Sequence, residues 1–237
     1  MKLQEAYDAL QEPDIELLIA AMNRVRQGAG PKAKASLAIL ADHHNARVRC
    51  NALRYLGMLN AYEAMGTIAH HALHDRSPRA RCISVAALAC LKRRIADLHM
   101  VDSLQDDDEL VVQTALSRLA IRGAKSSVPE IRRLLVDRRW TVRLEACNSL
   151  TVLGSVDETV IDTLKELSLC HQAVSYNEQV AISRQLTNVL FASGIIGDID
   201  SHRSTIGELF SSAADVLATL NNKKQARGNR RSLQSAA

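Results

Sequence analysis

The sequence VRCNALRYLG spans residues 48–57 and returns in altered form three more times along the chain. The later copies begin at Ala80, Val111 and Val142, so successive copies are spaced by 32, 31 and 31 residues. A second series has the same period and closes an apolar stretch each time: Asp75, Asp106 and Asp137. A fixed period of this length is typical of proteins built from repeated supersecondary units.

Within each copy, apolar and small residues recur at fixed offsets from the first residue. Offsets 0, 4, 5 and 8 fall on one face of a helix with 3.6 residues per turn. Offset 4 carries the small residues Ala52, Ser84, Ala115 and Ala146. Offset 5 carries Leu53, Val85, Leu116 and Cys147, offset 8 carries Leu56, Leu88, Leu119 and Leu150, and offset 9 carries Gly57, Ala89, Ala120 and Thr151. We expect this face to be buried, with the small residues allowing close approach of a neighbouring helix.

The helix boundaries are also readable from the sequence. Asn45, Ser77 and Asp108 stand three residues before their copies and are good N-caps. Offset 12 reads Asn60, Lys92, Gly123 and Gly154, and three of these four suit a left-handed helix end. The predicted second helices of the four units are Tyr62–His74, Arg94–Gln105, Ser127–Val136 and Glu158–Leu169. One such helix pair cannot bury its own apolar face, so the pairs are expected to stack into a solenoid.

The pattern Val-Arg-x-x-Ala-x-x-x-Leu-Gly, intact at residues 48–57, resembles the HEAT-like repeat of the phycobilisome-lyase type. The following Asp and the period near 31 match that family too, and the resemblance covers Asn45–Leu169. It implies an all-α fold: a right-handed α-solenoid of HEAT-like helix pairs, with about four clear repeats plus helical caps. One departure is Val112, which replaces the arginine of the other copies, so the ladder of Asp and Arg contacts is expected to be interrupted there.

The flanking sequence divides the chain into four parts. Residues 1–44 are predicted to form an N-terminal helical cap or degenerate repeats, and residues 45–169 the four HEAT-like repeats. Residues 170–221 are predicted to form a C-terminal helical cap, and residues 222–237 a disordered basic tail. The helices expected in the first part are Leu3–Leu10, Ile15–Val25 and Lys32–Asp42.

Charge and cysteine content limit the function classes. The net charge of the 237 residues is +4, but the tail carries five basic residues and no acid, so the rest of the chain is close to neutral. That balance argues against a nucleic-acid-binding body. Five cysteines without CxxC spacing indicate neither a disulfide framework nor a zinc ribbon. With no apolar signal core at the start and no membrane-length apolar run, a cytoplasmic protein is expected.

The turn before Val142 breaks the pattern of the repeats. Arg139 stands where the other copies have an N-cap residue, and Trp140 stands where they have a small, acidic or proline residue. Tryptophan and arginine are enriched in interface hot spots. The alternative is that Trp140 folds back on the neighbouring turn and Arg139 is simply solvated. The candidate partner-binding residues are Trp140, Arg139, Arg138, Arg132, Arg133, His70 and His71, the last four placed on the surface because the resemblance implies that second helices line the concave side.

No residue is assigned a catalytic, cofactor-binding or metal-binding role. His70 and His74 share a helix face at a spacing that can hold a metal, but a solvated face is the preferred interpretation because no third ligand is evident. The sequence shows no phosphate-binding glycine loop and no nucleophile paired with a base. The chain is therefore predicted not to be an enzyme and to need no cofactor.

The leading hypothesis is a non-enzymatic protein–protein interaction module: a scaffold, an adaptor, or an assembly or regulatory factor that binds a protein partner on its curved surface. One alternative is nucleic-acid binding through an Arg-rich face and the basic tail. A second, carried by the resemblance alone, is a bilin-lyase-like or chaperone-like role.

Overall fold

A computed structural model describes residues 1–169. All secondary-structure elements in that range are α-helices or 3-10 helices. The chain forms two compact units, residues 1–155 and residues 156–237. The predicted C-terminal cap (170–221) and basic tail (222–237) lie outside the described residues. Within the described residues, no helix is both long enough and apolar enough to cross a membrane.

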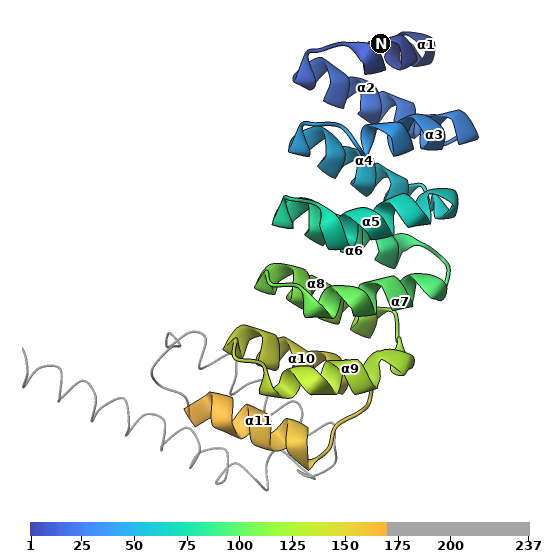
Figure 1. The fold of residues 1–237 in the computed structure, drawn as a ribbon. Helices are drawn as coiled ribbons and strands as arrows, with labels where there is room; N and C mark the ends of the chain where they lie inside the picture. Colours follow the sequence, from blue (N-terminus) through green and yellow to red (C-terminus); the bar gives the residue numbers. More distant parts are fainter. Residues whose placement is uncertain (170–237) are drawn as a thin grey trace, which may run out of the picture. The chain divides into compact units, whose positions relative to one another are not determined.

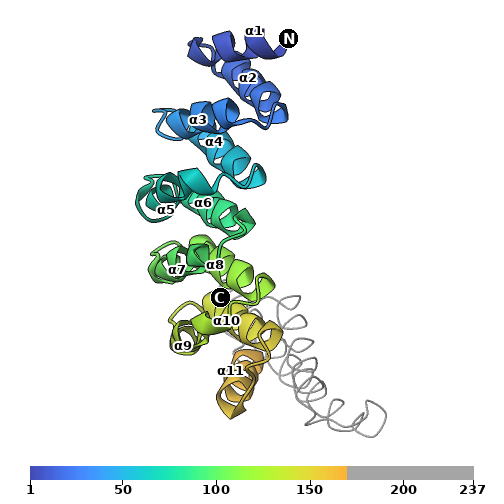
Figure 2. The same ribbon diagram turned by 90° about the vertical axis from the view of Figure 1, so that its right-hand side faces the viewer.

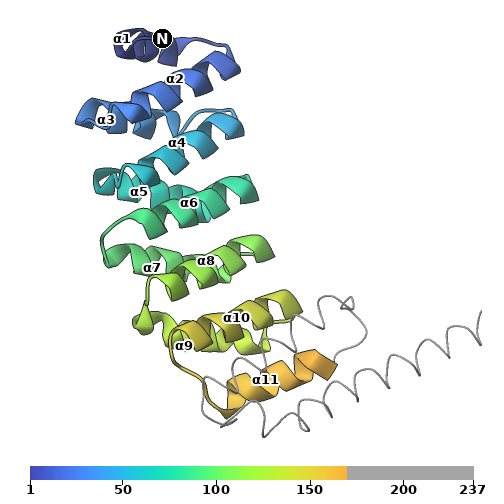
Figure 3. The same cartoon turned by 180° about the vertical axis from the view of Figure 1, so that it is seen from behind.

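The first unit stacks helices in two layers (Figures 1 and 2). The first layer consists of α2 (Ile15–Gln27), α4 (Ala46–Met58), α6 (Pro78–Cys90), α8 (Glu109–Ile121) and α10 (Trp140–Val152). The second layer consists of α1 (Leu3–Asp8), α3 (Pro31–Leu40), α5 (Met65–His74), α7 (Ile95–Asp102) and α9 (Val128–Arg133). We call a first-layer helix and the second-layer helix that follows it a pair. The same alternation is visible from behind in Figure 3, and it is the α-solenoid that the repeat predicts.

Short 3-10 segments extend most second-layer helices. They are η1 (Ala9–Gln11) after α1, η2 (Tyr62–Ala64) before α5, η3 (Ser103–Gln105) after α7, and η4 (Lys125–Ser127) and η5 (Leu134–Val136) on either side of α9. With these included, the predicted second helices are confirmed to within two residues at each end. The described part of the second unit is α11, whose bounds, Glu158–Leu169, are the predicted ones.

The buried face is the one that the offsets predict. All sixteen residues at offsets 0, 4, 5 and 8 are fully buried, including the four leucines at offset 8. Gly57 shows why offset 9 must be small, because a Cβ atom there would lie 2.7 Å from the Cα of Ala87 on the next first-layer helix. The shared apolar seam between layers is therefore the core of this unit.

The ends of the first-layer helices follow their predicted signals except at Ser77, whose side chain makes no capping hydrogen bond. Asn45 and Asp108 accept hydrogen bonds from backbone amides of the first turn, 2.9 Å from the nitrogens of Arg47 and Leu110. At the other end, Asn60, Gly123 and Gly154 have positive φ angles of 47°, 66° and 70°. Lys92 does not, and α6 instead ends at an extended Leu91.

The N-terminal region contains a degenerate repeat. Asp14 caps α2, and Ala21, Met22 and Val25 are buried at the places that offsets 4, 5 and 8 occupy in the clear copies. Ala29, at offset 12, has a φ of 51°. The pattern therefore extends one copy further toward the N-terminus than the sequence motif itself. The division between compact units falls after residue 155, inside the predicted fourth pair, and the proposed domain boundaries remain predictions.

Candidate partner-binding surface

The turns that join one pair to the next form one edge of the stack, on the left in Figure 1. We call it the ladder edge because aspartates and arginines bind one another along it. Arg49 binds Asp75 through two parallel hydrogen bonds of 2.8 and 2.7 Å, and its third nitrogen donates to the carbonyls of His43 and His44. One guanidinium thus joins both helices of a pair to the turn before them.

The next pair repeats this geometry. Arg81 binds Asp106 at 2.7 and 2.9 Å and donates to the carbonyl of Asp75. Each ladder aspartate also accepts a hydrogen bond from the backbone amide two residues later, which shapes the turn into the next helix. Burial alone would raise the pKa of Asp75, but the hydrogen bonds from Arg49 and Ser77 outweigh it and lower that pKa to about 2.

The ladder is not interrupted at Val112, contrary to the sequence prediction. Val112 is fully buried, and Arg139 supplies the missing guanidinium from the next helix start. Its Nε and Nη2 lie 3.0 and 2.9 Å from the carboxylate of Asp137, and its Nη1 donates to the carbonyls of Asp106 and Asp107. These contacts match those of Arg81, which binds the carboxylate of Asp106 and the carbonyl of Asp75. The Arg139 hydrogen bond is the main reason that the pKa of Asp137 is lowered.

His71 is buried on α5, whereas the sequence predicted that it would lie on an exposed face. Its Nδ1 lies 3.1 Å from Asp75 and its Nε2 lies 3.0 Å from Asp42. Both ring nitrogens of His71 therefore face carboxylates, one from the turn before α4 and one from the turn after α5. The expectation failed because the alignment of His71 with Arg133 takes no account of the two carboxylates that surround it in the stack.

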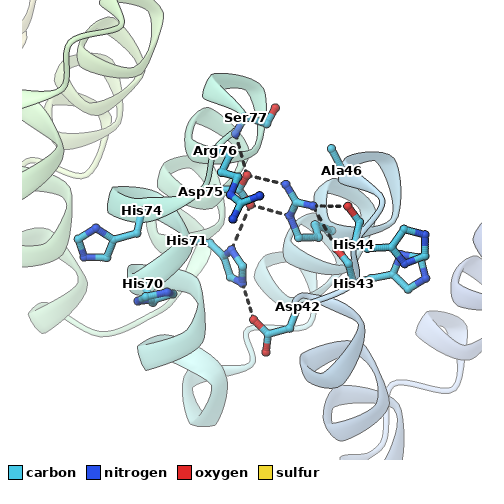
Figure 4. A pocket seen from close by; sticks show the side chains of 11 residues that line it. Asp42, His43, His44, Ala46, His70, His71, His74, Asp75, Arg76 and Ser77 are labelled. Atoms are coloured by element: carbon cyan, nitrogen blue, oxygen red, sulfur yellow. Dashed lines mark hydrogen bonds and ion pairs between the residues drawn. The ribbon is translucent and has the colours of Figure 1, made fainter.

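A pocket of about 530 Å³ opens beside this histidine on the ladder edge (Figure 4). Its wall comes from α5, the first turn of α4, the turn after α3 and the turn after α5. The lining side chains that carry chemistry are Asp42, His43, His44, Arg49, His70, His71, His74, Asp75, Arg76 and Ser77. Burial and the neighbouring His44 lower the pKa of His43. Arg49, His71 and Asp75 are already bound to one another or to the backbone, so the floor of the pocket serves the stack.

The two histidines considered for a metal lie on the rim of this pocket. The ring centroids of His70 and His74 are 5.0 Å apart. Among the described residues, no group of three or more His, Cys, Asp or Glu side chains is arranged to hold a metal ion.

The structure does not bring the predicted binding residues together. His70 is exposed on α5, whereas the Arg and Trp candidates lie two to three pairs away, on α9, in the turn that follows it and at the start of α10. Arg133 and Arg138 are exposed and Trp140 is half-buried in the first turn of α10. Arg132 lies close to Ser155, with its Nη2 3.1 Å from the hydroxyl, and Arg139 is occupied in the ladder. Whether any of these residues binds a partner stays a prediction.

A different recurring feature is absent from the predicted binding residues. Offset 10 carries an apolar or sulfur side chain in every copy, and all four are exposed: Met58, Cys90, Ile121 and Val152. These residues sit in the last turn of successive first-layer helices, at the edge opposite the ladder. The signal was available, because offset 10 is apolar in each copy although it lies off the buried face of the helix.

Comparisons with known proteins agree with this architecture. A family model for HEAT repeats matches residues 98–171. A structure of YibA from Escherichia coli is 16% identical, with a TM-score of 0.60, and the match covers 91% of this chain and 92% of that one. The complex of CpcE and CpcF of phycocyanin lyase from Nostoc sp. PCC7120 gives 15% identity and a TM-score of 0.54 over 80% of this chain and 95% of that one.

A designed armadillo repeat protein in complex with the peptide (KR)4 is 17% identical, with a TM-score of 0.51, over 81% of this chain and 99% of that one. No curated protein matches the sequence. Residues 98–171 match the HEAT-repeat model, and the described residues have the architecture of HEAT-like repeats; at these identities the likeness to solved structures extends to the fold alone.

Proposed function

We propose that this chain is a non-enzymatic protein-interaction module that binds its partner along the edge where the first-layer helices end. The observation that carries the proposal is the exposed apolar side chain at offset 10 of every copy. Single exposed apolar residues are ordinary, but a series in one register forms an extended feature that the core does not need. Ile121 is 71% exposed and Met58 is 57% exposed.

The fold supports this use. HEAT and armadillo repeats commonly mediate protein interactions, and the designed armadillo protein that resembles this chain holds a peptide. A bilin-lyase-like role is supported only by likeness of fold, and no feature of the described residues favours it. A scaffold, an adaptor or a regulatory factor fits the same surface.

The test is affinity capture from native lysate with the full chain and two matched variants. Ile121→Glu places a charge in the offset-10 series, and Val136→Glu places one at an even more exposed apolar residue of the second layer. We expect at least one protein to be lost with Ile121→Glu and retained with Val136→Glu, and the purified protein to bind this chain directly. If no bound protein distinguishes the two variants, the proposal is wrong.

Trp140 is tested separately, because it lies at the start of α10, on the ladder edge rather than on the edge of the offset-10 series. Trp140→Ala tests the predicted hot spot, with unfolding followed by circular dichroism to show that the helices persist. Loss of the same partner would place α10 in the interface, whereas unchanged affinity would remove Trp140 from it.

A further inference from the structure

The turns inside the pairs lie along the edge opposite the ladder, and contacts join each turn to the next. Lys34 binds Glu63 at 3.1 Å, and the side chain of Asn60 accepts a hydrogen bond from the backbone of Lys92 at 2.9 Å. Arg122 donates to the carbonyls of Ala89, Leu91 and Arg93. These turns therefore form one continuous surface, which we call the basic edge (on the right in Figure 1).

The two edges differ in charge. The basic edge holds eleven Lys or Arg residues and three Asp or Glu residues in its turn regions, which are residues 23–34, 54–66, 90–97 and 118–130. The ladder edge holds ten Lys or Arg residues and eleven Asp or Glu residues in its turn regions, which are residues 12–16, 42–49, 75–81, 102–109 and 132–143. The near neutrality of the whole body thus conceals one edge with a clear excess of positive charge.

The few acids of the basic edge do not offset this excess. Glu63 is paired with Lys34 and Asp97 with Arg122, and Glu130 lies 3.8 Å from Arg133. Lys92, Arg93 and Arg94 are exposed, and none of them has a carboxylate partner among the described residues. Their charges are open to an incoming anionic group.

Tyr62 stands at the centre of this edge, between basic residues of the neighbouring turns. The Arg93 guanidinium lies 4.9 Å from its ring centroid, and the Lys34 amine lies 5.9 Å from it. The tyrosine is 52% exposed, and the exposed Met58 and Ile95 belong to the same two turns. An exposed tyrosine flanked by arginine and apolar side chains has the composition of an interface hot spot.

We propose that the basic edge, centred on Tyr62 and Arg93, binds an acidic segment of the protein partner that also carries apolar side chains. The proposal rests on the proposed function and adds the chemistry of the partner. Carboxylates bind guanidinium groups through two parallel hydrogen bonds, and apolar residues of the same segment can cover Met58 and Tyr62. A nucleic-acid backbone offers charge but no aliphatic groups for these apolar side chains.

The probe is a fluorescein-labelled peptide of sequence EELEFEEELEFE, titrated with the full chain and followed by fluorescence anisotropy at several salt concentrations. We expect saturable binding that weakens as salt rises. Lys92→Glu/Arg93→Glu should weaken it by about tenfold or more. The matched control is Arg76→Glu/Arg79→Glu, which reverses two exposed arginines near the ladder edge and should change affinity by less than about twofold. Equal losses in the two variants, or no binding by the wild-type chain, would overturn the proposal.

The basic tail is a competing site, because residues 222–237 contain five Lys or Arg residues. A benzophenone version of the peptide, cross-linked to the full chain and mapped by mass spectrometry, separates the two sites. Adducts within residues 54–64 and 90–98 are the expected result, and adducts confined to the tail would contradict it. A labelled RNA dodecamer that binds more tightly and loses affinity in the same variant would identify a nucleic-acid surface instead.

The two proposals can fail separately. A captured partner that is lost with Ile121→Glu but binds Lys92→Glu/Arg93→Glu as well as wild type supports the interaction module and excludes an acidic ligand on the basic edge. Absence of any partner for the wild-type chain removes the proposed function itself.

Discussion

The guanidinium group of Arg139 lies against the carboxylate of Asp137, with its Nε 3.0 Å from Oδ1 and its Nη2 2.9 Å from Oδ2. Both side chains are largely buried, with 19% and 13% of their surface exposed. Removing one partner of such a pair leaves a buried charge without its counterpart. We expect Arg139→Ala to lower the free energy of unfolding by about 2–3 kcal/mol, measured by urea denaturation.

The same relationship predicts a rescue. In Val112→Arg/Arg139→Ala the new arginine occupies the register of Arg49 and Arg81, so the double variant should recover at least half of the loss. Val112→Arg alone should not stabilise the protein, because Arg139 already binds Asp137. Additive effects of the two substitutions would show that residue 112 cannot reach the carboxylate.

The fold could be predicted from the sequence because the repeat encodes it locally. In every copy, the small residue at offset 4 and the leucine at offset 8 indicate which face of that helix is buried. The ladder replacement could not be predicted in this way. In the sequence, Arg139 stands at the N-cap place of its helix without being a residue that caps well. Only the folded turn shows that its side chain reaches Asp137 and two carbonyls of the preceding turn.

The candidate surface was harder to predict than the fold. His71 was expected to be exposed because its aligned residue is Arg133, but the carboxylates of Asp42 and Asp75 allow the stack to bury it. The cluster around Tyr62 leaves no sequence pattern, because its members come from three different turns. The exposure of offset 10 could be predicted from the sequence, because that offset lies on the side of the helix away from the buried face.

Asp75 predicts a stability that depends on pH. Its pKa in the folded chain is about 2, below the ordinary value of 3.8, so the ionised form is favoured by folding. The contribution is fully present above about pH 4 and is lost as pH falls toward 2; at 1.36 kcal/mol per pKa unit it amounts to about 2 kcal/mol. The difference in unfolding free energy between wild type and Asp75→Asn should therefore shrink over that range. Asp107→Asn, which removes a carboxylate from an exposed residue, is the matched control.

The cysteines should differ sharply in reactivity toward a maleimide. Burial raises the pKa of Cys147 to about 12, so at pH 8 roughly one thiol in ten thousand is the reactive thiolate. Cys90 is exposed in the last turn of α6. We expect native labelling at Cys90, and labelling at Cys147 only in urea, with the modified peptides identified by mass spectrometry. Rapid native modification of Cys147 would show that α10 opens far more readily than its packing indicates.

Two glycines provide a matched test of how closely the first-layer helices pack. A Cβ atom on Gly57 would lie 2.7 Å from the Cα and 2.8 Å from the Cβ of Ala87, whereas one on Gly66 in α5 would meet no atom within 4 Å. Gly57→Ala must push α4 and α6 apart and should cost about 1–3 kcal/mol of unfolding free energy.

Gly66→Ala should instead stabilise α5 by about 0.5–1 kcal/mol, because alanine is the better helix former and nothing obstructs it. Urea midpoints of the two variants, measured side by side, should therefore move in opposite directions from wild type. A Gly57→Ala midpoint at or above that of wild type would mean that the two helices have room for a methyl group, and that the small residue at offset 9 is not required for stacking.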